Sequence, residues 1–105
     1  MTTYYELTGF QRDLLEAIAG VDDEPYGLAL KQYLDERYAD PINHSRLYQN
    51  LTQLADQNLV NRKELDGRTN EYTLTDAGTQ LLQYHADTIA SLCDQPRPGA
   101  GESQR

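Results

Sequence analysis

The segment from Pro41 to Thr75 constrains the fold of this chain more than any other. Its first half carries apolar residues at helical spacing, which predicts an amphipathic helix over residues 43–57. The apolar stripe consists of Leu47, Leu51, Leu54 and Ala55. Asn43 is placed to cap the start of this helix, which puts the positive end of the helix dipole beside His44.

Two short alternating runs follow this helix, at residues 60–65 and 70–74. Asp66-Gly67 lies between them, and this pair between alternating runs is a strong short-range signal for a β-hairpin. The hairpin is basic, because it carries Arg62, Lys63 and Arg68.

The outward face of the helix over residues 43–57 is polar and poor in acidic residues. On a helical wheel four side chains fall opposite the apolar stripe: Ser45, Arg46, Gln49 and Gln53. Side chains of these types hydrogen-bond to base edges and to phosphates. Such a helix followed by a basic hairpin predicts a winged helix-turn-helix, with the helix in the major groove of DNA and the hairpin along its backbone. Either feature alone is usually a solvated surface, and their order favours DNA binding.

The rest of the sequence predicts three more helices, which makes the fold mainly α (α+β). Thr8 is expected to cap a helix over residues 9–19, and a second helix is expected over residues 26–38. Thr75 is expected to cap a last helix that ends near Leu92.

Two residues beside the second helix carry expectations of their own. Gly27 indicates either that the backbone approaches another helix closely at this point or that the glycine only makes the turn into the helix easier to form. Ile42, which follows Pro41, is expected to form a minimal third strand beside the hairpin.

The last helix has a broad apolar face, formed by Leu81, Leu82, His85, Ile89 and Leu92. The core of one 105-residue domain does not need so much apolar surface at its end, so residues 75–93 are predicted to be a dimerisation helix. A dimer would also relieve the shortage of core in a chain with one Phe, no Trp and eight Tyr. We therefore expect residues 1–93 to form one winged-helix domain and residues 94–105 to be a disordered tail.

The net charge of −8 is unusual for a nucleic-acid-binding protein, but it is unevenly distributed. Residues 1–40 hold three basic and nine acidic side chains, whereas residues 41–74 hold four of each. The segment that is predicted to face DNA is therefore neutral in an acidic chain. Scarce Lys and abundant carboxylates indicate a salt-rich cytoplasm. Since counterion release contributes little at molar salt, we hypothesise that inorganic cations bridge acidic side chains to DNA phosphates.

The sequence points away from membrane, metal and enzyme functions. No apolar run is long enough to span a membrane and the N-terminus does not look like a signal peptide, so the protein is expected in the cytoplasm. His44 and His85 lack metal-ligand spacing and catalytic partners, so neither cofactor nor catalysis is expected. Cys93 is interpreted as a packed thiol or as an intersubunit disulfide site, and the acidic run at residues 22–24 as solvated or cation-binding.

Three stretches resemble the PadR family of winged-helix transcriptional regulators, in its short single-domain form. They are PYGLALKQYL from residue 25, RLYQNLTQLADQNLV from residue 46 and DGRTNEYTLTDAG from residue 66. The acidic composition is similar to that of PadR-like regulators of halophilic archaea, some of which respond to oxidative or other stress. The resemblance implies a homodimer bound to a pseudo-palindromic operator in double-stranded DNA.

The resemblance also implies roles for individual residues. Tyr48 would contact phosphate, and Arg46 and Gln49 would read bases, although many family members carry proline at the position of Gln49. The wing contacts would come from Arg62, Lys63 and Arg68. The complete predicted DNA surface adds Asn43, His44, Ser45, Gln53 and Asn70.

A second reading of the same features is a winged-helix module that binds proteins, since folds of this kind also serve as interaction modules. The acidic surface would then suit a basic partner. The polar helix face and the basic hairpin favour DNA, because a protein-binding module has no need of either.

Overall fold

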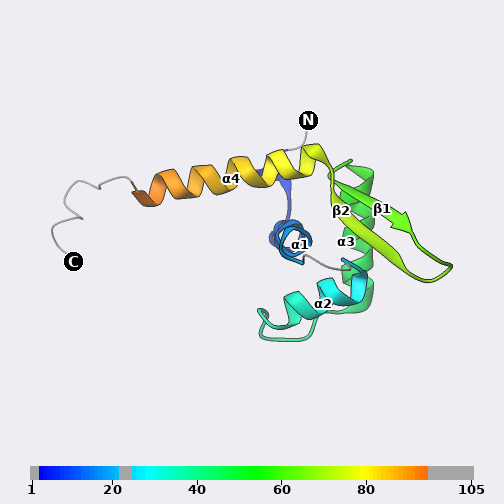
Figure 1. The fold of residues 1–105 in the computed structure, drawn as a ribbon. Coiled ribbons are helices and arrows are strands. Elements are labelled where there is room, and N and C mark those ends of the chain that lie inside the picture. Colours follow the sequence, from blue (N-terminus) through cyan, green and yellow to red (C-terminus); the bar gives the residue numbers. More distant parts are fainter. Residues whose placement is uncertain (1–2, 22–24, 95–105) are drawn as a thin grey trace.

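The computed structural model describes residues 3–21 and 25–94, which fold into a helical body with one hairpin. In chain order the elements are η1 (Tyr4–Glu6), α1 (Gly9–Gly20), α2 (Gly27–Asp35), α3 (His44–Asp56), β1 (Val60–Glu64), β2 (Asn70–Leu74) and α4 (Asp76–Asp94). Figure 1 shows that α4 extends from this body on one side and the hairpin on the other. The predicted acidic loop at residues 22–24 and residues 95–105 of the predicted tail lie outside the described residues. Asp94, the first residue of that predicted tail, is instead the last residue of α4.

Three of the helices begin at the caps that the sequence predicts. The Thr8 side chain accepts a hydrogen bond from the backbone N–H of Gln11, and the Gln11 side chain accepts one from Thr8, which forms a complete capping box. Asn43 caps α3 through its side-chain oxygen, and Thr75 accepts a backbone N–H in the first turn of α4.

The core lies where α1, α2 and α3 meet. Its seven fully buried large side chains are all leucines, namely Leu14, Leu15, Leu30, Leu34, Leu47, Leu51 and Leu54. Burial of each of these side chains stabilises the folded state by about 1.5–3 kcal/mol. The apolar stripe predicted for α3 is thus confirmed, and its opposite face stays in solvent.

The second helix is shorter than predicted, because it ends at Asp35 and not at Tyr38. One carboxylate oxygen of Asp35 accepts from the Lys31 ammonium at 2.7 Å, and the other accepts from the backbone N–H of Ile42 at 2.7 Å. These hydrogen bonds, the one from Lys31 first, lower the pKa of Asp35. The chain therefore folds back at this point instead of continuing the helix.

The prediction of a third strand at Ile42 is wrong. The backbone N–H of Ile42 is taken by Asp35, and its side chain is buried in the core. Tyr26 forms the extra bridge to the hairpin instead, opposite Glu71, and the N–H of Tyr72 donates to the Pro25 carbonyl at 2.9 Å. The hairpin is thereby attached to the start of α2.

The hairpin is antiparallel, and its first strand stops one residue before the predicted end. The N–H of Leu65 donates to the Thr69 carbonyl at 2.9 Å and closes the turn, so Leu65 belongs to the loop. Tyr72 is buried and Thr73 is exposed, as the alternation of side chains along a strand requires.

The two halves of α4 have different surroundings. Leu81 and Leu82 pack against the core, and the His85 ring stacks on Tyr4 with centroids 3.9 Å apart. Farther along, Ile89 and Leu92 are 45% and 49% exposed, where the helix has left the body (Figure 1). Within residues 3–21 and 25–94, no helix has the length and apolar character needed to cross a membrane.

Candidate nucleic-acid interface

The outer face of α3 forms the first part of the candidate interface. A shallow hollow of about 610 Å³ on this face is lined by Ser45, Tyr48, Gln49, Thr52 and Gln53. All five side chains are exposed. Sequence reasoning missed Thr52, although it follows Gln49 by three residues and therefore shares its face of the helix.

The predicted base reader Arg46 lies apart from this hollow. Its guanidinium carbon is 4.0 Å from the ring centroid of Phe10 on α1. A cation–π contact at an exposed site is worth about 0.5–1 kcal/mol. Arg46 therefore stabilises the contact between α1 and α3 in the free protein.

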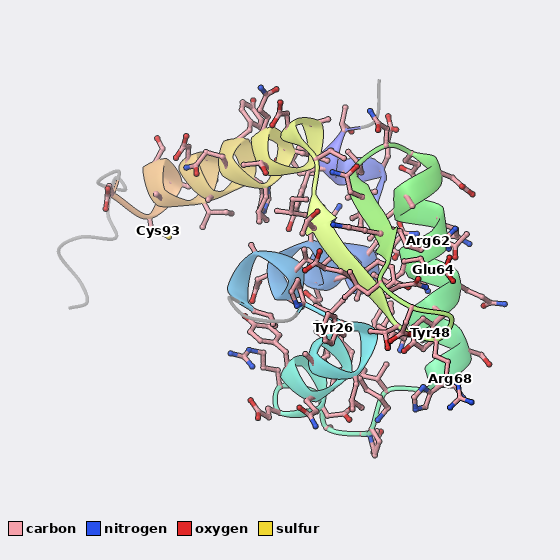
Figure 2. All side chains as sticks on the ribbon, turned by 45° about the vertical axis from the view of Figure 1, so that its right-hand side comes forward. Tyr26, Tyr48, Arg62, Glu64, Arg68 and Cys93 are labelled. Atoms are coloured by element: carbon pink, nitrogen blue, oxygen red, sulfur yellow. The ribbon has the colours of Figure 1, made fainter. Side chains whose placement is uncertain are left out.

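A second hollow joins α3 to the start of α2 and to the wing. Its volume is about 290 Å³, and it is lined by Tyr26, Gly27, Leu28, Tyr48, Arg68, Thr69, Asn70 and Tyr72. Figure 2 shows Tyr26, Tyr48 and Arg68 gathered on the side of the molecule away from Cys93. Sequence reasoning placed Tyr48, Arg68 and Asn70 on the interface but missed the contributions of Tyr26, Leu28 and Thr69.

Gly27 allows Tyr48 to lie against α2. A Cβ atom at Gly27 would come within 2.3 Å of the Tyr48 hydroxyl oxygen and 2.7 Å of a ring carbon. Of the two explanations for this glycine, the close approach to another helix is thus confirmed. The signal in the sequence is a glycine in the first turn of a helix, where its flexibility alone would be unfavourable.

The second hollow has the features of a phosphate-binding site. No side chain caps α2, so the N–H groups of its first turn lack partners within the helix. The positive end of a helix dipole and open N–H groups together favour an anion. Tyr48 and Arg68 both line this hollow, and a tyrosine hydroxyl and an arginine guanidinium can each donate to phosphate oxygens. The His44 ring is nearly parallel to that of Tyr48, with centroids 6.0 Å apart, and so lies at the edge of this site.

The hairpin turn is held by Asp66. Its carboxylate accepts backbone N–H groups from Arg68 and Thr69, each at 2.9 Å. These hydrogen bonds, the one from Arg68 first, lower the pKa of Asp66. The turn thus fixes the backbone of Arg68 while its side chain stays exposed.

The other two basic residues of the wing lie on opposite faces of the hairpin. Arg62 pairs with Tyr72 across the strands, whereas Lys63 pairs with Glu71. Since paired residues share a face and successive residues alternate, Arg62 lies on the face that Tyr72 turns toward the body. Figure 2 shows Arg62 beside α3 accordingly.

The fold and this surface together define a class of protein. Three helices form the core, the third exposes a polar face, and a hairpin lies beside it with a hollow that Arg68 helps to line. This arrangement is a winged helix-turn-helix.

Comparison with known proteins identifies the family. The chain matches the transcriptional regulator PadR-like family over residues 14–84 and belongs to that family. It is therefore a DNA-binding transcriptional regulator and not an enzyme. No curated protein matches the chain.

Solved structures agree with this assignment. RosR of H. salinarum, from crystals grown in NaBr, is 38% identical, with a TM-score of 0.80 over 89% of this chain and 83% of that one. The hsRosR-S1 complex is 40% identical, with a TM-score of 0.77 over 83% of this chain and 76% of that one. Bacillus subtilis PadR in complex with operator DNA shares the fold at 22% identity, with a TM-score of 0.59 over 89% of this chain and 52% of that one.

Proposed function

We propose that the protein acts as a homodimer that binds a pseudo-palindromic operator, with the outer face of α3 in the major groove. The observation that supports this proposal is that the hollow lined by Arg68 lies beside the polar face of α3, with Tyr48 lining both hollows. A phosphate in the one hollow would fix the register in which α3 meets the base edges. Gln49 and Gln53 would then be base readers, and Tyr48 and Arg68 phosphate contacts.

Binding of fluorescent duplexes by Arg68→Ala tests the phosphate contact. We expect affinity to fall about tenfold on cognate and random duplexes alike, because phosphate contacts carry no sequence information. Arg37→Ala is the matched control, since Arg37 is also exposed but follows the other end of α2 and packs on Tyr33. Equal affinities for the two variants would contradict the proposed role of the hollow.

We further propose that the interface works at high salt with inorganic cations between protein and DNA. Each basic residue of the wing has an acidic neighbour: Lys63 pairs with Glu71, Arg62 shares a face with Glu64, and Arg68 lies on the turn that Asp66 holds. Such a wing offers little net positive charge for counterion release. The likeness to H. salinarum RosR also supports salt adaptation. The resemblance in composition to PadR-like regulators of halophilic archaea motivates a role in a stress response, which transcript profiling of a deletion strain under oxidant would test.

Affinity measured between about 0.2 and 2 M KCl tests this salt adaptation. We expect affinity to decline only slightly, or to rise, because cations would link the carboxylates to phosphates. The variant Glu64→Gln should make the decline steeper. A steep loss of affinity for the wild-type protein across this range would rule out cation bridging.

A further inference from the structure

Gln11 is a buried polar residue that links α1 to the DNA-facing helix. Its side chain is only 5% exposed. The side-chain oxygen accepts from the backbone N–H of Thr8 at 3.2 Å. The side-chain nitrogen donates to the Asn50 side-chain oxygen at 3.1 Å and to the Gln53 side-chain oxygen at 2.8 Å. The oxygen and both N–H groups of the Gln11 side chain therefore have hydrogen-bond partners inside the protein.

The orientation of these amides follows from one backbone group. The N–H of Thr8 can only donate, so Gln11 must turn its oxygen toward Thr8 and its nitrogen toward α3. The two N–H groups of the Gln11 side chain then face α3, and they need acceptor oxygens there. Asn50 is fixed the same way from its other end, since its nitrogen donates to the Arg46 carbonyl at 2.8 Å. Gln53 must therefore give its oxygen to Gln11.

The outward end of Gln53 is consequently a hydrogen-bond donor. Gln53 is exposed and lines the hollow on the outer face of α3. Its oxygen is engaged by Gln11, and within the described part of the chain no acceptor pairs with its side-chain nitrogen. A free glutamine could turn either its oxygen or its nitrogen toward a base, whereas the oxygen of this one is directed at Gln11 and its nitrogen, a donor, is left for the groove.

We propose that Gln53 reads the major groove only as a donor, that Gln11 is the positioning residue behind this restriction, and that guanine is the base Gln53 selects. The inference rests on the proposed function, in which α3 enters the major groove. Guanine presents two acceptors there, N7 and O6, whereas thymine presents only O4 and cytosine presents a donor. Adenine presents one acceptor, N7, and its bidentate pairing with glutamine needs the side-chain oxygen directed at the base, whereas the Gln53 oxygen is directed at Gln11.

The variant Gln11→Glu should reverse the preference of Gln53. Glutamate at this position still completes the capping box with Thr8, and its charge is favourable at the N-terminus of α1. A carboxylate has no N–H to offer, so Gln53 would turn its nitrogen inward and its oxygen outward. The base opposite Gln53 should then be one that presents a donor, cytosine or adenine. In Gln11→Met, which keeps the length without the amide, Gln53 can turn either way and guanine should lose its advantage over adenine.

The experiment is selection of bound sequences from a randomised duplex library by the wild type, Gln11→Glu, Gln11→Met and Gln53→Ala. For the wild type we expect one position in each half-site with about fivefold preference for guanine, at the lower end of base-edge discrimination. Gln53→Ala should lose the preference at that position alone. Gln11→Glu should replace guanine there, and Gln11→Met should relax it.

Two results would overturn the inference while leaving the proposed function intact. One is a motif that Gln53→Ala selects unchanged. The other is a uniform loss of affinity in Gln11→Met and Gln11→Glu with the base preference kept, which would make Gln11 a purely structural residue. If the wild type selects no motif at all, sequence reading fails and this inference fails with it.

Discussion

At the scale of single residues, tyrosines replace the large aromatic side chains that this chain lacks. Tyr72 on β2 has a buried side chain, and the Tyr4 ring stacks on the His85 ring. Tyr38 packs edge-on against Phe10 and donates its hydroxyl to the Asp13 carboxylate. An amphipathic ring can fill a core and still need a polar partner, so several contacts between elements are hydrogen-bonded as well as apolar.

The Tyr38 contact predicts a loss of stability at alkaline pH. Burial first, and then the hydrogen bond to Asp13, raises the pKa of Tyr38 to about 12, above the value near 10 of an unfolded chain. Its stabilising contribution is complete below about pH 10 and is lost as pH rises toward 12, because the unfolded chain releases this proton first. Urea unfolding measured across this range should show the decline. The variant Tyr38→Phe, about 1 kcal/mol less stable at neutral pH, should show a smaller decline. An equally steep decline in Tyr38→Phe would exclude Tyr38 as its cause.

The sequence predicts which α3 residues face outward but not what each one touches. The helical wheel places Arg46 and Gln53 on the polar face, and both are exposed. That Arg46 lies on Phe10 and Gln53 bonds to Gln11 depends on how α1 packs across α3. Spacing within one helix carries no information on that crossing. The contacts of Gln11 with α3 depend on the same crossing, and no pattern in the sequence pointed to them.

At the scale of elements, local signals predicted the starts of helices and the hairpin well. Caps at Thr8, Asn43 and Thr75 act through the first turn of their own helix, so the sequence contains them. The end of α2 and the strand partner of the hairpin were missed, because both depend on distant groups. Asp35 binds the N–H of Ile42, and Tyr26 reaches Glu71.

The contact between α2 and α3 predicts that Gly27→Ala damages both stability and DNA binding. The added methyl group would meet the Tyr48 hydroxyl and ring, which must move within the hollow between α2, α3 and the wing. We expect a loss of about 1–3 kcal/mol in the free energy of unfolding, as for other overpacked sites, and weaker binding of duplex DNA. Gly9→Ala is the control, since nothing lies within 4 Å of a Cβ there.

A double variant separates the clash from other effects of the alanine. With Tyr48→Ala in the background, Gly27→Ala should cost much less, because the clashing ring is gone. If Gly27→Ala and Gly9→Ala unfold at the same denaturant concentration, Tyr48 does not pack on α2 as described.

At the scale of the whole molecule, α4 connects the winged-helix body to the proposed dimer. Its first half is part of the body, through Leu81, Leu82 and His85. The exposed apolar side chains of its second half, Ile89 and Leu92, are the part of the predicted dimer face that the body leaves uncovered. The sequence could not show which part of this apolar face packs on the body and which part stays exposed, because the apolar spacing is continuous along the helix.

The proposed dimer predicts that Ile89→Asp yields folded monomers. Ile89 is 45% exposed, so the substitution should leave the thermal midpoint of the isolated subunit nearly unchanged while a buried charge opposes association. Sedimentation velocity should show the halved mass, and affinity for a two-half-site operator should fall. Ala90→Asp is the matched control, since Ala90 is also exposed but lies about 100° around α4 from Ile89. Dimers of unchanged stability in Ile89→Asp would place the interface elsewhere.

The central claim is that this protein reads DNA sequence as a dimer through the outer face of α3. Its most direct test is genome-wide selection of bound DNA fragments at molar KCl, with the wild type, Gln49→Ala and the control Gln32→Ala in parallel. Gln49 is preferred to Arg46 because Arg46 also packs on Phe10. We expect a palindromic motif with the wild type and Gln32→Ala that weakens or changes with Gln49→Ala. No enrichment by a folded, dimeric wild-type protein would contradict the account and favour a protein-binding module.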